Sequence, residues 1–272
     1  MKIASIHGAL LDFRRMELLA GGGTALHRLD PRAKLLVTLF FIGTVVSYGK
    51  YAVTGMIPLV IFPVVMASLG ELPPGYIARK IALLSPFALV VGLFNPLFDR
   101  TVLIHLGPLG ISGGWISFSS ILIRSILTVG AATILVALTG FPAICRALEQ
   151  LGTPRLLTVQ LSFLHRYLFV LIEEGGRLSR GRELRAFGNR GLGIGSFAPL
   201  IGNLLLRTWG RAERIHAAML ARGFTGEFHL RRESRFGGRE LLFTVGWSIA
   251  FVALRFWNLP QLLGRVVTGI TS

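Results

Sequence analysis

The sequence predicts an all-α membrane protein with about five transmembrane helices and a cytoplasmic platform of about three amphipathic helices inserted before the last span. Three observations support this fold class. Of the 272 residues, 52% are hydrophobic and 15% are charged, whereas soluble domains carry about a quarter of charged residues. Several segments are apolar over about 20 residues, the length that crosses roughly 30 Å of hydrocarbon. Sixteen arginines and no lysine lie between Phe141 and Arg239, with apolar segments on both sides.

The amino-terminal segment, residues 1–35, lacks the continuous apolar core of a signal peptide. Charged residues and a histidine interrupt it, among them His7, Asp12, Arg14, Arg15, Glu17, Arg28, Asp30 and Arg32. We therefore expect the amino terminus to stay in the cytoplasm. Cys145 is the only cysteine, so the sequence predicts neither a disulfide framework nor a cluster of thiolate metal ligands.

The first two spans follow each other closely. Apolar residues run from Ala33 to Gly49 and again from Tyr51 to Leu69, and only Lys50 separates them. This short connection requires a tight antiparallel hairpin. The polar residues 71–80 come next.

The third span covers Ile81 to Phe98. Pro86 and Pro96 should kink it, because membrane helices tolerate proline when neighbouring groups satisfy the freed backbone. Glycines and a proline punctuate Asp99 to Gly114, so this segment is predicted to be a turn region.

Two further spans, Trp115–Thr139 and Glu240–Trp257, bring the predicted number of crossings to five. Lysine and arginine collect in short cytoplasmic loops, and the basic residues agree with a cytoplasmic amino terminus. The cytoplasmic side then holds the sixteen platform arginines and Lys2, Arg14, Arg15, Arg28, Arg32, Lys34, Arg79 and Lys80. The outer side holds Lys50, Arg100 and Arg265, and the spans hold Arg124 and Arg255.

Leu156 to Ile172 is apolar enough to be mistaken for another span, although a glutamine, a histidine and an arginine interrupt it. If it crossed, the thirteen arginines from Arg177 to Arg239 would lie outside unless Ile194 to Leu206 crossed back. That return segment is too short to span a bilayer. We therefore predict a helix lying at the inner surface of the membrane.

Turn and cap signals predict three helices within residues 141–239, the arginine-rich platform. The first begins at Phe141 and stops at Gly152, with a proline tolerated in its opening turn. Thr153 caps the second, which runs to about Phe187. The third runs from Phe197 to Gly223.

The two long platform helices end alike. Arg185 lies one turn before Gly188, and Arg222 lies directly before Gly223. Each arginine follows an apolar residue by seven positions, so it continues the apolar face of its helix. A partner with an apolar groove and an acidic end would fit such a tip. For either arginine alone, attraction to the helix dipole, about 0.3 to 1 kcal/mol, is the simpler explanation.

Four segments resemble the transmembrane (T) component of energy-coupling-factor transporters, and the resemblance covers most of the chain. They are Leu29-Asp30-Pro31-Arg32-Ala33-Lys34-Leu35, Phe94-Asn95-Pro96-Leu97-Phe98, Arg166-Tyr167-Leu168-Phe169-Val170-Leu171-Ile172-Glu173-Glu174, and Arg211-Ala212-Glu213-Arg214 with Ala218-Met219-Leu220-Ala221-Arg222-Gly223-Phe224. The stretch from Ala137-Leu138-Thr139-Gly140-Phe141-Pro142 through Tyr167 is most similar to the cobalt/nickel subtype, whose T component serves one substrate-binding subunit.

The resemblance implies a non-catalytic coupling subunit of an ATP-driven importer, for cobalt or nickel. Its cytoplasmic helices would seat Ala-Arg-Gly motifs in grooves of two ATP-binding-cassette ATPase subunits and relay their movement to a membrane-embedded substrate-binding (S) subunit. Ala221-Arg222-Gly223 matches the motif fully. Leu184-Arg185-Ala186 keeps only the arginine in its place.

The implied location is the cytoplasmic (inner) membrane. Residues 1–140 would form the amino-terminal segment and four spans, residues 141–239 the coupling platform, and residues 240–272 the last span with an external tail. ATP and magnesium would bind the partner ATPases, so this chain is expected to hold no cofactor and no metal.

The residues themselves also predict that this chain does not hydrolyse ATP. The nearest approach to a Walker A sequence, Gly43 to Tyr51, has five residues between its glycines and lacks Ser or Thr after Lys50. The six histidines include no pair three or four residues apart and no nearby cysteine–histidine set, which gives no metal-site pattern.

Three residues within the spans are candidates for an intramembrane role: Arg124, Asn95 and Pro96. A charge in a span is often functional and faces protein or water. Snorkelling of Arg124 towards the outer surface, or simple kink packing at Asn95 and Pro96, explains them equally well.

Two other functional classes stay open. A self-sufficient permease needs its own polar site near the bilayer midplane, and the spans offer little beyond Arg124, Asn95 and Arg255. A membrane-tethered nucleic-acid binder would use the arginines on phosphates. The apolar stripes disfavour it, as does the presence of one aromatic residue, Phe187, from Arg177 to Arg190. Co-purification of ATPases, of nothing, or of nucleic acid distinguishes the three classes.

Overall fold

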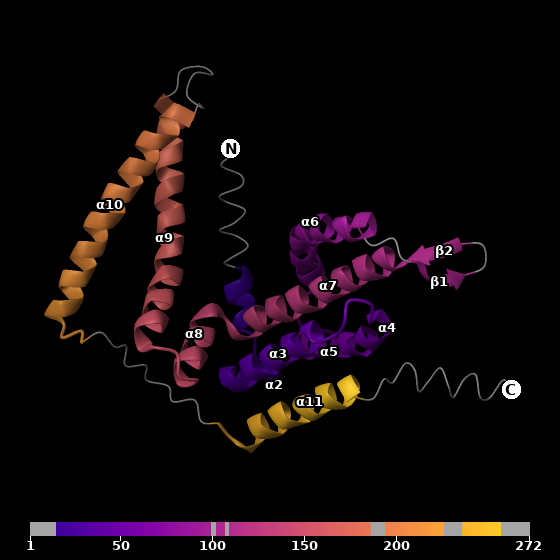
Figure 1. The fold of residues 1–272 in the computed structure, drawn as a ribbon. Helices are drawn as coiled ribbons and strands as arrows, with labels where there is room; N and C mark the ends of the chain where they lie inside the picture. Colours follow the sequence, from indigo (N-terminus) through magenta and orange to yellow (C-terminus); the bar gives the residue numbers. More distant parts are fainter. Residues whose placement is uncertain (1–14, 99–101, 107–108, 186–193, 226–235, 257–272) are drawn as a thin grey trace. The chain divides into compact units, whose positions relative to one another are not determined.

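The computed structural model describes residues 15–98, 102–106, 109–185, 194–225 and 236–256 (Figure 1). The chain groups into two compact units. We call residues 19–140 and 234–272 the membrane unit, and residues 1–18 and 141–233 the platform unit. Among the described residues, this grouping places residues 15–18 in the platform unit and residues 236–239 in the membrane unit, whereas the predicted division assigns them the other way round.

Apolar helices build the membrane unit, as the sequence predicts. They are α2 (Ala25–Arg28), α3 (Pro31–Val46), α4 (Val53–Met56), the 3-10 helix η1 (Ile57–Val60), α5 (Ile61–Leu69), α6 (Pro74–Phe98), α7 (Gly113–Thr139) and α11 (Gly238–Phe256). The five predicted spans fall on α3, on the run from α4 to α5, and on α6, α7 and α11. The second is not one regular helix, because Pro58 and Pro63 remove backbone donors within it.

Residues 99–114 contain more structure than the predicted turn region. Strands β1 (Val102–Leu106) and β2 (Leu109–Ser112) pair antiparallel between α6 and α7, with Leu106 opposite Leu109. Valine, leucine and isoleucine suit paired strands, but the segment is too short for its pattern to stand out from a loop. The helical fold class is confirmed, and this small hairpin is an addition to it.

Helix α6 packs along α7 and is bent (Figure 1). Pro86 lies inside α6, where its ring removes the N–H that would bond the carbonyl four residues earlier. That carbonyl belongs to Ala82, and the Ser85 hydroxyl donates to it at 3.0 Å. Further along, Gly92 faces the ring of Phe118 on α7 so closely that an added Cβ would lie 2.9 Å from it.

An aromatic cluster joins α3, α5 and α11 in the core of the membrane unit. Phe41, Phe62, Trp247 and Phe251 contact one another, with ring centroids 4.6 to 5.6 Å apart. Phe41 and Phe251 are fully buried. Tilted and edge-to-face pairs of this kind add to the free energy of burial, so α11 is anchored to α3 and α5.

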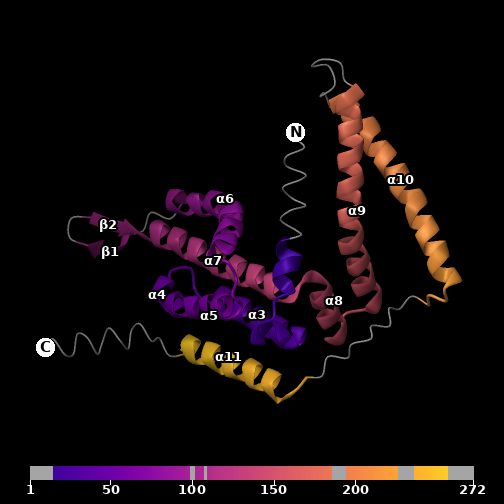
Figure 2. The same ribbon diagram turned by 180° about the vertical axis from the view of Figure 1, so that it is seen from behind.

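Within residues 141–233, the described platform helices are close to the predicted ones: α8 (Phe141–Gln150), α9 (Arg155–Arg185) and α10 (Ile194–Ala221). Residues 15–20 are also helical, and residues 15–18 belong to this unit. Helices α9 and α10 lie side by side in both views (Figures 1 and 2). Helix α9 continues through its three glycines, and α10 begins three residues before the predicted Phe197.

Three helices of the described chain are long and apolar enough to cross a membrane: Pro74–Pro96 in α6, Gly113–Thr139 in α7 and Arg155–Arg182 in α9. The first two are predicted spans. The third contains the segment predicted to lie at the membrane surface, and its length and composition also permit a crossing. Val53–Leu69 is apolar but shorter. The number of five crossings therefore stays a prediction.

Candidate functional site

The carboxyl end of α10 has the geometry of a Schellman motif. Gly223 adopts φ +80°, its N–H bonds the Leu220 carbonyl at 2.9 Å, and the Phe224 N–H bonds the Met219 carbonyl at 3.0 Å. A left-handed residue after the last helical turn is the usual position for glycine. Apart from the neighbouring residues of the chain, nothing lies within 4 Å of the Cβ that another residue would add, so conformation rather than space requires glycine here.

This turn presents Arg222 to solvent. Ala221, Arg222 and Gly223 are all exposed, while Ile215 and Met219 on the preceding turns are half-buried. The predicted arrangement, an apolar face that leads to a positive tip, therefore describes the end of α10. The closing hydrogen bonds fix the backbone that carries the guanidinium.

The end of α9 is described less completely. Leu184 has 84% of its surface exposed, and Arg185 is the last residue of the helix. The side chain of Arg185 and the whole of Ala186 lie outside the described residues. The first predicted coupling motif is therefore located at a helix end, and its side-chain geometry stays a prediction.

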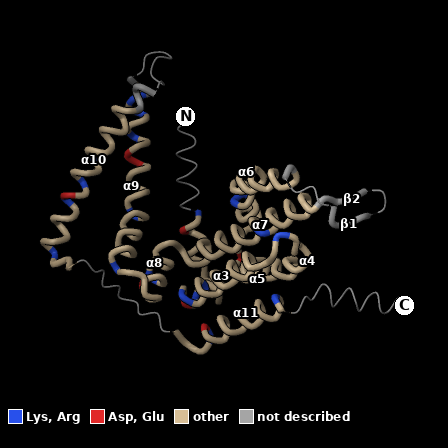
Figure 3. The backbone as a smooth tube through the Cα atoms, viewed as in Figure 1, with Lys and Arg blue, Asp and Glu red and all other residues tan. Residues whose placement is uncertain are grey.

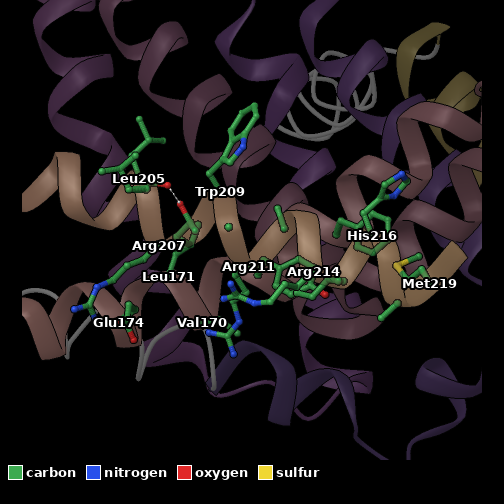
Figure 4. A pocket seen from close by; sticks show the side chains of 18 of the residues that line it. Val170, Leu171, Glu174, Leu205, Arg207, Trp209, Arg211, Arg214, His216 and Met219 are labelled. Atoms are coloured by element: carbon green, nitrogen blue, oxygen red, sulfur yellow. Dashed lines mark hydrogen bonds and ion pairs between the residues drawn. The ribbon is translucent and has the colours of Figure 1, made fainter. Parts of the chain in front are cut away.

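An elongated groove of about 1130 Å³ runs between α9 and α10 (Figure 4). Its walls are mainly apolar, with Phe163, Tyr167 and Val170 from α9 and Leu205, Ile215 and Met219 from α10. Arginines follow its length on α10, and Figure 3 shows basic residues on both helices.

An ion pair joins the two walls of this groove. Arg207 on α10 lies 3.0 Å from a carboxylate oxygen of Glu174 on α9. Arg177 contacts Glu173 and Glu174 at 3.1 and 3.8 Å on the same stretch of α9. Exposed ion pairs contribute about 0 to 1 kcal/mol each, so the half-buried apolar faces hold the helices together and the charges fix their register.

Helices α8 and α9 meet through an aromatic contact. The ring of His165 stacks on Phe141 at 4.9 Å between centroids and meets Phe169 edge-on at 5.3 Å. His165 also lies 3.8 Å from Glu17. Cys145 on α8 is buried, and this burial raises the pKa of its thiol despite a hydrogen bond with Ser162. Among the described residues, no group of three histidine, cysteine or acidic side chains could hold a metal ion.

The intramembrane candidates belong to the membrane unit. Arg124 on α7 donates to the carbonyls of Tyr48 and Gly49, at 2.9 and 3.4 Å, just beyond the end of α3. Asn95 and Pro96 lie in the last turn of α6 and are half-buried. These contacts of Arg124 are made at the turn after α3.

Sequence reasoning missed a buried cation at the other end of α3. Lys34 has 1% of its surface exposed, whereas the charge distribution predicts it among the cytoplasmic charges. Its ammonium donates to the Leu138 carbonyl at 3.2 Å and to the His27 carbonyl at 3.4 Å. Buried Asp30 caps the same helix by accepting from the Arg32 N–H at 2.8 Å. The sequence feature that could have indicated this burial is a lysine in the first turn of an apolar helix.

Comparison with known proteins adds to this geometry. The family CbiQ, described as cobalt transport protein, matches residues 22–233. That range covers most of the chain and includes Arg222. The chain belongs to the CbiQ family. The resemblance inferred from the four sequence segments is thereby confirmed, and the chain is a multi-pass membrane protein of the transport class.

Individual relatives carry two names. The energy-coupling factor transporter transmembrane protein EcfT of Heliobacterium modesticaldum is 28% identical over 253 residues, 85% of this chain and 92% of that protein. EcfT of Streptococcus thermophilus is 26% identical over 254 residues, 86% of this chain and 91% of that protein. The cobalt transport protein CbiQ of Salmonella typhimurium is 34% identical over 109 residues, 39% of this chain and 48% of that protein.

Proposed function

We propose that this CbiQ-family chain is the energy-coupling transmembrane subunit of an ATP-driven importer. The tips of α9 and α10 dock in two ATP-binding-cassette ATPase subunits, and their movement passes to a membrane-embedded S subunit that holds the substrate. The observation that carries the proposal is the exposed Arg222 at a helix end closed by left-handed Gly223. Membership of the family supports it.

The chemistry of the tip suits docking to a protein. A guanidinium keeps its charge at physiological pH and offers a planar set of donors to carboxylates and backbone carbonyls. The Schellman closure holds the backbone beneath it through hydrogen bonds at 2.9 and 3.0 Å, so little backbone freedom is lost on binding. An acidic groove in each ATPase is the complementary surface.

Movement of one tip would reach the other through the paired helices. Glu174 and Arg207 join α9 to α10 at 3.0 Å, and half-buried apolar residues line the space between them. Closure of the two ATPases around nucleotide would displace the tips, and packed helices transmit such displacements as rigid bodies. ATP and magnesium bind the ATPases in this proposal, and this chain carries no cofactor.

The proposed substrate is a cobalt or nickel ion bound by the S subunit. The CbiQ family description and the cobalt transport protein of Salmonella typhimurium support cobalt, whereas the relatives that align over most of the chain are EcfT proteins. The proposed location is the inner membrane with the amino terminus in the cytoplasm, in agreement with the distribution of basic residues.

Charge reversal at the tip tests the proposal. Arg222→Glu should weaken ATPase co-purification in mild detergent by about tenfold or more, since an arginine at the centre of an interface is often worth about 2 kcal/mol or more. Uptake of radiolabelled cobalt should fall in parallel. Arg211→Glu makes the same change on an exposed residue of the same helix, away from its tip, and should retain the ATPases. Normal assembly and uptake with Arg222→Glu would rule out docking at this tip.

A further inference from the structure

Helices α3 and α7 pack against each other in the membrane unit and run antiparallel (Figure 1). The first turn of α3 meets the last turn of α7 through Lys34 and Leu138. At the opposite end, Arg124 of α7 meets Tyr48, two residues beyond the end of α3. A cation of each helix therefore reaches backbone carbonyls at the carboxyl end of the other.

The carbonyl that Lys34 binds has no partner in its own helix. The last carbonyls of a helix lack intrahelical donors, and the residue four positions after Leu138 is Pro142, which has no N–H. Lys34 has 1% of its surface exposed, and its ammonium donates to the Leu138 carbonyl at 3.2 Å. If the two groups separated, the buried carbonyl would lose this donor and the buried cation would lose one of its two carbonyl partners, which is unfavourable.

The last turn of α7 is held from a third side as well. Gly70 follows the end of α5, and a Cβ added there would collide with the side chain of Leu138. The carbonyl of His27 in α2 also accepts from the Lys34 ammonium, at 3.4 Å. This turn is therefore fixed to α3 and packed against α5.

Arginines from two helices hold the carboxyl end of α3. Arg124 donates to Tyr48 at 2.9 Å and to Gly49 at 3.4 Å. Arg255 of α11 donates to Ser47 at 3.2 Å, and its guanidinium lies 4.5 Å from the centre of the Tyr48 ring. Cations at a helix carboxyl end are also favoured by the helix dipole. The intramembrane arginines thus have backbone partners within this chain.

We propose that Lys34 and Arg124 are positioning residues that lock α3 and α7 into one rigid bar. Gly140, with φ +77°, follows α7 directly and ends it, so this bar reaches the point where the chain enters the platform unit. Displacement of the platform then moves α3 together with α7 instead of bending the last turn of α7. The inference rests on the proposed coupling function, because it assigns the path by which coupling leaves the platform.

Two apolar substitutions test the bar in the assembled transporter. Lys34→Met and Arg124→Met keep much of each side-chain stem but remove the donors. We expect each to retain both ATPases and to hydrolyse ATP within about twofold of the wild type, because Arg222 is unchanged. Cobalt uptake per ATP hydrolysed should fall by about tenfold. A purely structural role would lower assembly, ATP hydrolysis and uptake together.

Hydrogen exchange gives a readout that does not depend on transport. Amides of residues 131–140 should exchange faster in Lys34→Met, and those of residues 44–50 faster in Arg124→Met. Arg124→Lys keeps one charged donor and should show intermediate coupling. Lys50→Met removes an exposed lysine from the turn after α3 and should behave as the wild type.

The result that overturns the bar is specific. In a complex in which Arg222→Glu abolishes ATPase docking, unchanged uptake per ATP in both methionine variants rejects the bar and leaves the proposed function standing. If Arg222→Glu has no effect, the proposed function fails first. If Lys34→Met does not assemble, the coupling ratio of Arg124→Met decides alone.

Discussion

Single residues at the end of α10 have separate physical tasks. Arg222 carries the charge, and Gly223 supplies a backbone conformation that places this charge beyond the last turn. The sequence predicted both, because a glycine that ends a helix is a strong local signal. It did not predict the burial of Lys34, because the carbonyl partner at Leu138 lies 104 residues further along the chain.

Replacement of Gly223 by alanine tests the conformational task. A left-handed conformation costs an ordinary residue about 1 to 2 kcal/mol, and no surrounding atom would contact the new Cβ. We expect the backbone amides at positions 223 and 224 to exchange faster than in the wild type. ATPase binding should weaken by about five- to tenfold. Titrated co-purification measures the second effect.

Two matched variants separate backbone strain from loss of a small residue. Asparagine tolerates the left-handed region better than alanine, so Gly223→Asn should retain most of the affinity. Gly210 lies inside α10, and a Cβ added there would make an ordinary contact, 3.6 Å from the Arg214 side chain. Alanine favours a helix at such a position. Equal losses from Gly223→Ala and Gly210→Ala would show that the closing turn has no special role.

At the scale of elements, the close approach of α6 and α7 depends on Gly92. An added Cβ would lie 2.9 Å from the Phe118 ring, so Gly92→Ala forces the two helices apart or moves the ring. Overpacking of this kind typically costs about 1 to 3 kcal/mol. We expect a lower melting temperature of the detergent-solubilised protein, measured by thermal unfolding with fluorescence detection.

The control for this prediction is the same substitution in α3. Gly43 lies inside that helix, and nothing stands within 4 Å of an added Cβ. Alanine there removes a flexible residue without a clash, so Gly43→Ala should keep or raise the melting temperature. Destabilisation by Gly43→Ala equal to that of Gly92→Ala would contradict the packing argument.

Helices were predictable where local signals were strong, and other elements were not. Apolar length located α3, α6, α7 and α11, and the stop glycines located the ends of α8 and α10. The β1–β2 hairpin was missed because its strands have five and four residues, too few to show an alternating pattern. Prolines in the second span were visible, but their effect on helix type depends on the packing of neighbouring helices.

At the scale of the whole molecule, the apolar length of α9 is compatible with two arrangements: a helix at the inner membrane surface and a helix that crosses the bilayer. This helix is long and apolar enough to cross a bilayer, and little of its most apolar stretch is buried within the chain. A crossing would move the arginine tip of α9 to the opposite side of the membrane. The distribution of basic residues argues against it, because the thirteen arginines from Arg177 to Arg239 would then face outwards.

Cysteine labelling from one side of the membrane decides between these arrangements. Leu184 is 84% exposed beside the tip, so Leu184→Cys should react readily with a membrane-impermeant maleimide. The natural Cys145 is buried and its pKa is raised by burial, so it forms little reactive thiolate at neutral pH and gives a low background. We expect labelling of Leu184→Cys in inverted vesicles and none in intact cells.

An external control makes the result quantitative. Lys50 is exposed in the turn predicted to lie outside, so Lys50→Cys should show the opposite pattern, with labelling in intact cells. Labelling of both variants in intact cells would place the α9 tip outside, and a cytoplasmic ATPase could then not reach it. Opposite patterns would place α9 at the inner surface, where the length of its apolar face contacts lipid or protein without carrying its arginines across the membrane.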